Sequence, residues 1–272
     1  MLSYLFNDRS YYRTLLRLAV PIVFQYLISS SMNIIDVAMI GQLGETSVAA
    51  VGLSNQAFFI MTIVMFGISS GSAIFTAQYW GQRDVASIRR VLALCLGMGL
   101  IAAAIFSGIG LFAPASFLKI FTKDMAVVEL GSKYLGIVAS SYLVTAVTYS
   151  YSAVLRSTEE VRLPMVISSS AILFKTFLSY VLIFGHFGLP QMGVEGAAIG
   201  TVIARYLEAI VLLILNYKRK TPAAVKLTDL HGYTREFFRR FFRTVLPVTF
   251  NEFAWSTGVT VYPIVYAHIS TE

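Results

Sequence analysis

Seven long apolar stretches dominate this sequence, and each is long enough to cross a lipid bilayer as a helix. They lie at about 14–40, 48–78, 90–113, 133–155, 164–185, 195–217 and 244–268. A membrane-spanning helix needs about 20 mostly apolar residues, because its backbone amides must be hydrogen-bonded within the helix. Charged residues make up 13% of the chain, against about 25% in soluble domains. The sequence therefore predicts an all-α polytopic membrane protein.

Basic residues are distributed unevenly between the two sets of loops. Sixteen of the 21 Lys and Arg residues fall in the N-terminal segment and the second, fourth and sixth loops, while only three fall in the other loops. Lys and Arg are retained on the cytoplasmic side of membrane proteins. We therefore expect a plasma-membrane protein with a cytoplasmic N-terminus. Because these charges lie between apolar runs and not on one soluble face, they do not predict binding to nucleic acid.

The sixth loop, 218–243, is the longest. Phe and Arg alternate over its last nine residues, a pattern typical of an amphipathic helix on the anionic inner leaflet. We interpret this loop as a cytoplasmic linker between two helix bundles.

The sequence repeats itself at an offset of 226 residues. Segments 11–31 and 237–257 share an Arg–Arg–Pro spacing, Arg13, Arg17 and Pro21 in the first and Arg239, Arg243 and Pro247 in the second. A repeat of six spans returns to its starting side, so the two copies would be parallel, with a binding site between them. This register predicts a six-helix N-lobe at 1–217, the linker, and the first helix of an incomplete C-lobe at 244–272. We expect the chain to be a truncated part of a two-lobed transporter that is monomeric at full length.

Four stretches of the sequence resemble one known family, and they occur in the same order as in that family. LAVPIVFQYLISSSMNIIDVAMIGQLGETSVAAVGLSNQ (18–56), AQYWGQRD (77–84), LIFGHFGLPQMGVEGAAIGTVIAR (182–205) and LPVTFNEFAWS (246–256) resemble multidrug and toxic compound extrusion (MATE) transporters. The resemblance implies a twelve-helix, two-lobed antiporter that expels organic cations in exchange for sodium or protons. It also implies that Asp36 is an N-lobe site for the coupling cation or proton.

Ionisable groups within membrane spans are costly, so each is a functional candidate. Gln25, Ser29, Asn33 and Asp36 are spaced 4, 4 and 3 residues apart, which places them on one helix face. We expect this polar stripe to line a hydrated cavity, and we assign Gln25, Ser29 and Asn33 to the substrate cavity. The alternative is a structural helix-to-helix hydrogen bond.

Lys175 departs from the resembled family, which commonly has amide side chains at the positions of Lys175 and Ser179. Thr201, in the sixth predicted helix, matches a further polar residue of the same family. Because an ammonium would occupy the electrostatic place of a sodium ion, we expect Lys175 to pair with Asp36. Asp36, Lys175, Ser179 and Thr201 are thus the predicted coupling residues, with no cofactor or metal site and with either a proton or sodium as the coupling ion.

The seventh span carries a carboxylate and an aromatic residue on one face, Glu252 and Trp255. This combination suits a flat organic cation, so we assign both residues, with Tyr149, to the substrate cavity. Tyr149 belongs to a polar stripe that is more typical of core packing. Arg205 and Glu208 are spaced i, i+3, and we interpret them as a mutually neutralising structural pair.

The remaining motifs are structural or absent. Gly67-Ile-Ser-Ser-Gly71 predicts close helix packing, and Cys95 is the single cysteine. The sequence contains no P-loop, zinc motif or catalytic triad, so we do not expect an enzyme. Two alternatives stay open: a lipid-linked oligosaccharide flippase of the wider superfamily, which should have more cations in its cavity, and an inactive truncated relic.

Overall fold

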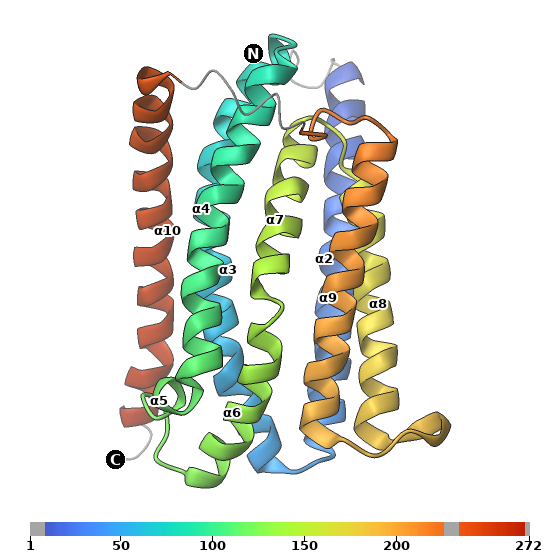
Figure 1. The fold of residues 1–272 in the computed structure, drawn as a ribbon, viewed down its shortest axis with the longest axis vertical. Coiled ribbons are helices and arrows are strands. Elements are labelled where there is room, and N and C mark those ends of the chain that lie inside the picture. The colour runs from blue at the N-terminus through green and yellow to red at the C-terminus, as the bar shows by residue number, and fades with distance from the viewer. Residues whose placement is uncertain (1–8, 226–233, 270–272) are drawn as a thin grey trace.

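The computed structural model describes residues 9–225 and 234–269, and nearly all of these residues are helical. The helices are α2 (Arg9–Gly41), α3 (Glu45–Gly81), α4 (Val85–Phe112), α5 (Pro114–Leu118), α6 (Met125–Ala139), α7 (Tyr142–Ser157), α8 (Arg162–Phe184), the 3-10 turn η1 (His186–Gly188), α9 (Gly193–Lys218) and α10 (Arg235–Ile269). The long helices run side by side along one axis (Figure 1). Five of them, α2, α3, α4, α8 and α9, are long and apolar enough to cross a membrane.

The predicted fourth span, 133–155, is a bent pair of helices. α6 and α7 meet at an angle of 51° and together satisfy the length and hydropathy of one span. At the bend, the hydroxyls of Ser140 and Ser141 donate to the carbonyls of Ile137 and Val138, each at 2.7 Å. Serine side chains that bond back to their own helix promote such bends, because they compete with the regular backbone ladder.

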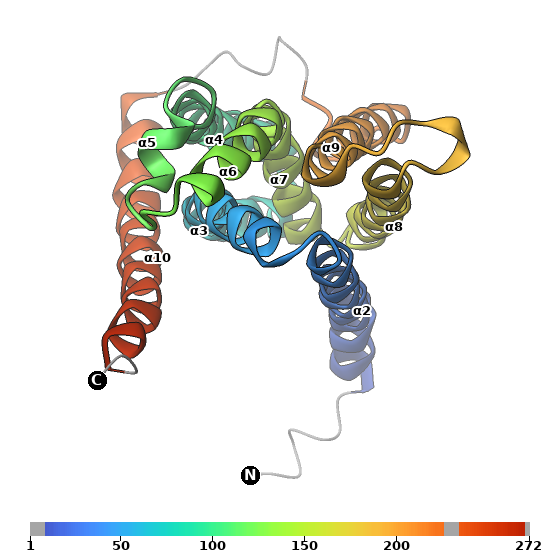
Figure 2. The ribbon, with the colours of Figure 1, turned by 90° about the horizontal axis from the view of Figure 1, so that it is seen from below.

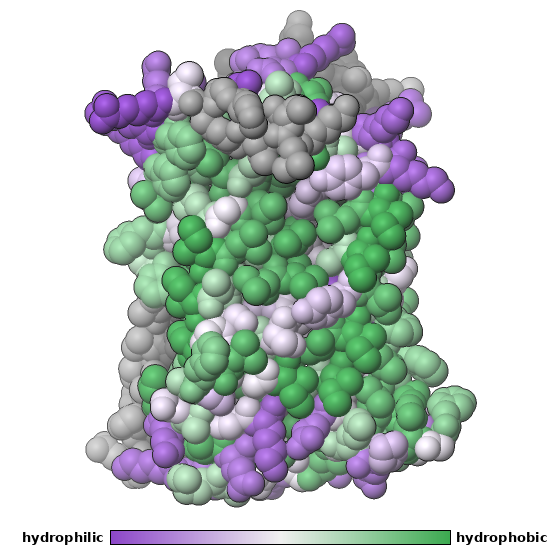
Figure 3. Space-filling model, viewed as in Figure 1, coloured by the Kyte–Doolittle hydropathy of each residue, from purple (hydrophilic) through white to green (hydrophobic). Residues whose placement is uncertain are grey.

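The connections alternate between the two ends of the bundle. The start of α2, the α3–α4 and α7–α8 turns, the end of α9 and the start of α10 all lie at one end (Figure 1). Hydrophilic residues gather at both ends of the molecule, with an apolar band between them (Figure 3). The segments that we predicted to share one side of the membrane are therefore on the same side. That this side is cytoplasmic stays a prediction.

No break separates the end of the predicted linker, at residue 243, from the predicted seventh span, which starts at residue 244. Residues 226–233 lie outside the described residues, and α10 starts at Arg235 and continues through 244 without a break. The aromatic residues of its first turns pack on α3, with the Phe241 and Phe75 ring centroids 5.7 Å apart and those of Phe237 and Tyr79 6.5 Å apart. The amphipathic pattern at 235–243 thus belongs to the same helix as the predicted seventh span, 244–268. α10 is not among the described helices that are apolar enough to cross a membrane, so this span stays a prediction.

Glycines set the closest helix contacts. A Cβ atom on Gly67 would lie 2.6 Å from the Cα atom of Thr249, and one on Gly71 would lie 2.9 Å from that of Val245. The small-residue face predicted in the sequence is therefore the surface on which α10 packs. Viewed along the bundle, α10 lies against α3 and α2 lies against α8, at two edges of the molecule (Figure 2).

Candidate functional site

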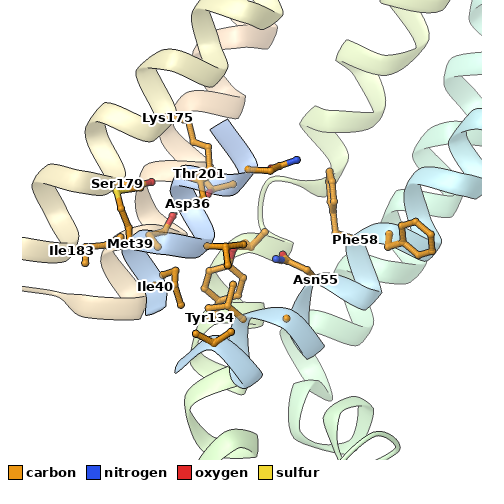
Figure 4. Close-up of a pocket in the computed structure, with 18 of the residues that line it drawn as sticks. Asp36, Met39, Ile40, Asn55, Phe58, Tyr134, Lys175, Ser179, Ile183 and Thr201 are labelled. Carbon is orange, nitrogen blue, oxygen red and sulfur yellow. Dashed lines mark hydrogen bonds and ion pairs between the residues drawn. The ribbon is translucent and has the colours of Figure 1, made fainter. Parts of the chain in front are cut away.

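A cavity of about 510 Å³ lies between α2, α3, α6, α8 and α9. Figure 4 shows residues of all five helices around it. We call it the N-lobe cavity. Its polar lining consists of Asn33, Asp36, Asn55, Thr62, Tyr134, Ser141, Lys175, Ser179, Thr201 and Arg205. All four predicted coupling residues therefore line one cavity, together with Asn33 from the predicted substrate group.

The Lys175 ammonium of α8 forms an ion pair and a hydrogen bond with the carboxylate of Asp36 in α2. The two side chains are 26% and 19% exposed, respectively, and both face the N-lobe cavity (Figure 4). The contact predicted between them is confirmed. Their role in coupling stays a prediction.

Ser179 and Thr201 lie beside this pair, because α8 and α9 pack closely. A Cβ atom on Gly200 would lie 2.8 Å from the Ser179 hydroxyl oxygen, and one on Gly196 would lie 2.7 Å from the carbonyl carbon of Leu182. The Thr201 hydroxyl donates to the carbonyl of Ala197 at 2.9 Å. The Ser179 hydroxyl is buried and has no hydrogen-bond partner among the described residues.

Arg205 and Glu208 form the predicted pair, with 3.2 Å between Nη1 and Oε2. Sequence reasoning missed the two residues that position this pair. The Ser168 hydroxyl of α8 donates to Oε1 of Glu208 at 2.6 Å, and the Arg205 guanidinium lies 5.4 Å from the Phe58 ring centroid. It also missed that Arg205 lines the N-lobe cavity, because the i, i+3 spacing says nothing about the cavity wall.

A second, more open cavity of about 590 Å³ lies between α3, α7 and α10. Its lining includes Tyr149, Glu252 and Trp255, so three of the predicted substrate residues lie together. Thr62 of α3 borders both cavities. Gln25 and Ser29 line neither of the two, although they occupy the same helix as Asp36.

Three further lining residues had no role in our sequence interpretation: Asn55, Phe58 and Tyr134. An amide in the middle of an apolar run was a usable signal for Asn55. Phe58 and Tyr134 carried no such signal, because aromatic residues are common throughout these spans.

Comparisons with known proteins agree with this architecture. The chain is 28% identical over 255 residues to a probable multidrug resistance protein NorM of Thermotoga maritima, covering 92% of the chain and 53% of that protein. It is 30% identical over 263 residues to the protein of the same name in Rhizobium meliloti, covering 96% of the chain and 53% of the relative. The chain thus spans about half the length of these relatives.

Solved structures share the fold. A multidrug resistance MATE family transporter of the MOP superfamily, in an outward-facing conformation, superposes with a TM-score of 0.80 at 22% identity, over 91% of this chain and 54% of that one. A MOP superfamily transporter of Pyrococcus furiosus, described as having a binding pocket of reverse polarity, gives 0.79 at 21% identity, over the same shares. The predicted half of a two-lobed helical membrane fold is confirmed. The MatE family model matches residues 21–181, which is more than half of the sequence, and the chain therefore belongs to the MatE family.

Proposed function

We propose that the protein is a secondary active antiporter that exports organic cations, drugs or metabolites in exchange for protons, by alternating access. Family membership and relatives named as multidrug resistance proteins support export of small molecules. A polar cavity inside an otherwise apolar helix bundle supports a transport pathway. The substrate and the coupling ion are our inference.

The ion pair between Asp36 and Lys175 carries the proposal of proton coupling. In a medium of low dielectric constant, an isolated charge is driven toward its neutral form, whereas a close pair can stay ionised. A proton that enters the cavity and neutralises Asp36 breaks the attraction to Lys175. Since the two residues belong to α2 and α8, loss of this attraction frees one helix to move relative to the other.

The same pair argues against a sodium site in this lobe. Hard cations are held by several oxygen ligands. Here the Lys175 ammonium is already paired with Asp36, the single carboxylate among the lining residues of the cavity, and it would repel a second cation at that position. The family resemblance alone leaves both ions open, and the position of Lys175 supports our proposal of the proton.

The second cavity supports binding of the cationic part of a substrate. Glu252 supplies a carboxylate, and Tyr149 and Trp255 supply aromatic faces. Cations are attracted to such faces by the ring quadrupole, most strongly where water is excluded.

Ethidium efflux from cells that express the full-length protein tests the proposal, with pH and sodium varied independently. We expect efflux to follow the proton gradient and to be lost in Asp36→Asn and Lys175→Met. Glu129→Gln is the matched control, because Glu129 is an exposed carboxylate on α6. Efflux that follows the sodium gradient, and that Asp36→Asn abolishes, would overturn proton coupling.

A further inference from the structure

We propose that Arg205 is an anion-binding residue of the N-lobe cavity, which binds the carboxylate group of an aromatic molecule that the protein transports. The inference deepens the proposed function, on which it rests for the statement that the bound molecule is transported. Binding at Arg205 is a separate property that can be measured at equilibrium, without any ion gradient.

The pair formed by Arg205 and Glu208 has a definite direction. The Glu208 side chain is 5% exposed and is held on the far side by the Ser168 hydroxyl, whereas the Arg205 side chain is 31% exposed. Arg205 lines the cavity, and Glu208 is not among its lining residues. The positive end of the pair therefore faces the space that a ligand would enter, and Glu208 acts as a positioning residue behind it.

The Arg205 guanidinium is held in place, but most of its N–H donors have no hydrogen-bond acceptor among the described residues. It has five N–H donors in a rigid fork, a geometry that matches the two oxygens of a carboxylate. Among the described residues, its one hydrogen bond is the donation from Nη1 to Glu208. The Phe58 ring of α3 packs against it, with its centroid 5.4 Å from the guanidinium carbon. An arginine held in this way loses little conformational freedom when it binds a ligand.

The charge and polarity of the cavity also favour an anionic group. Two cations, Lys175 and Arg205, line it with a single carboxylate, Asp36, and that carboxylate is already paired with Lys175. The Ser179 hydroxyl is 1% exposed, lines the cavity and has no hydrogen-bond partner among the described residues. A buried polar group without a partner is costly, so it marks a place where a polar ligand atom can bind.

The aromatic preference follows from α3. Phe58 and Phe59 line the N-lobe cavity, and Phe66 lines the second cavity, with Thr62 bordering both. Phe58 and Phe66 are eight positions apart in the helix, a rise of about 12 Å. A flat ring system can therefore pack against these aromatic side chains while its carboxylate binds Arg205.

A pair of dyes that differ in one functional group tests the inference. Rhodamine 110 carries a free carboxylate, and rhodamine 123 is its methyl ester with the same ring system. Fluorescence anisotropy with the purified chain in detergent should show the acid binding about tenfold more tightly than the ester, as expected for a charge-assisted hydrogen bond. Empty micelles correct for partitioning of the dyes.

Variants then assign the preference to Arg205. The double variant Arg205→Gln/Glu208→Gln should bind both dyes equally, because it removes the guanidinium without leaving Glu208 buried and unpaired. Glu208→Gln alone should keep the preference for the acid. Equal or tighter binding of the ester by the wild-type chain, or a preference for the acid that survives in the double variant, would overturn the proposal.

A measurement on the wild-type chain covers the case in which the double variant fails to fold. Benzoate should displace rhodamine 110, whereas benzamide, its neutral isostere, should not. Equal displacement by the two compounds contradicts anion binding. Because no gradient is involved, these results stand whether or not efflux proves to be coupled to protons.

Discussion

The Lys175 ammonium pairs with the Asp36 carboxylate inside the N-lobe cavity, although 139 residues separate them in the chain. The pair joins α2 to α8 at a wall of the cavity that includes Ser179 and Thr201 (Figure 4). Both carboxylates of this region are engaged by cations, Asp36 by Lys175 and Glu208 by Arg205. Breaking either pair should therefore have consequences for both stability and ligand binding.

Asp36→Asn and Lys175→Met should each lower the thermal stability of the chain by more than the double variant does. A single change leaves one charge without its partner, at a cost of about 1–3 kcal/mol, whereas the double change removes both charges. The reaction of the single, buried Cys95 with a thiol-reactive fluorophore reports unfolding during heating. A double variant less stable than both single variants would contradict the prediction.

Glu252→Gln in the full-length protein should abolish export of ethidium while leaving the amount of protein in the membrane unchanged. The carboxylate is the charged group of the second cavity, and the neutral amide cannot balance an organic cation. Efflux and immunoblotting of membranes measure the two quantities. Asn251→Ala is the control: it changes a neighbouring, uncharged residue of the same cavity, and export should be retained. Unchanged efflux in Glu252→Gln would limit Glu252 to a structural role.

Gly67→Ala should destabilise the packing of α10 on α3. The added Cβ would lie 2.6 Å from backbone of Thr249, and such overpacking costs about 1–3 kcal/mol. Gly97→Ala in α4 is the matched control, because no atom lies within 4 Å of a Cβ at that position. The control should be neutral or slightly stabilising, since alanine favours the helix. Equal melting temperatures for the two variants would count against this interface.

Cysteines at Arg219 and Ile120 should react with an impermeant maleimide from opposite sides of the membrane. Both positions are exposed. Arg219 directly follows α9 and Ile120 lies just after α5, and the end of α9 and the short helix α5 lie at opposite ends of the bundle (Figure 1). With Cys95→Ala as the background, intact cells should label Ile120→Cys and should not label Arg219→Cys. The reverse pattern would invert the predicted topology.

Asp84, at the start of α4, should make the chain sensitive to acid. The Ser87 hydroxyl and amide donate to its carboxylate at 2.6 and 3.0 Å, and they hold the pKa of Asp84 below its usual value. A group with a lowered pKa stabilises the folded state above its unfolded pKa, and this contribution is lost as pH falls through the folded pKa. The melting temperature of Asp84→Asn should thus be below that of the wild type at pH 7, and the difference should shrink as pH falls through the lowered pKa of the folded state. A difference that does not depend on pH would contradict the argument.

The sequence predicted the spans formed by α2, α3, α4, α8 and α9, the sharing of one end by the basic loops and the contact of Asp36 with Lys175. Each follows from local hydropathy or from the cost of an unpaired charge within a membrane. The glycine face on which α10 packs was also readable, because Gly67 and Gly71 are one helical turn apart.

Only the tertiary structure decided which side chains face the cavity. At the bend, the hydroxyls of Ser140 and Ser141 bond to carbonyls of α6, and near the start of α10 Phe241 is buried against α3. Arg205 lines the cavity while Glu208 lies behind it, because α9 packs tightly on α8 through Gly196 and Gly200 and thereby fixes its rotation. A helical rotation of this kind is set by neighbouring surfaces, which spacing along one sequence does not contain.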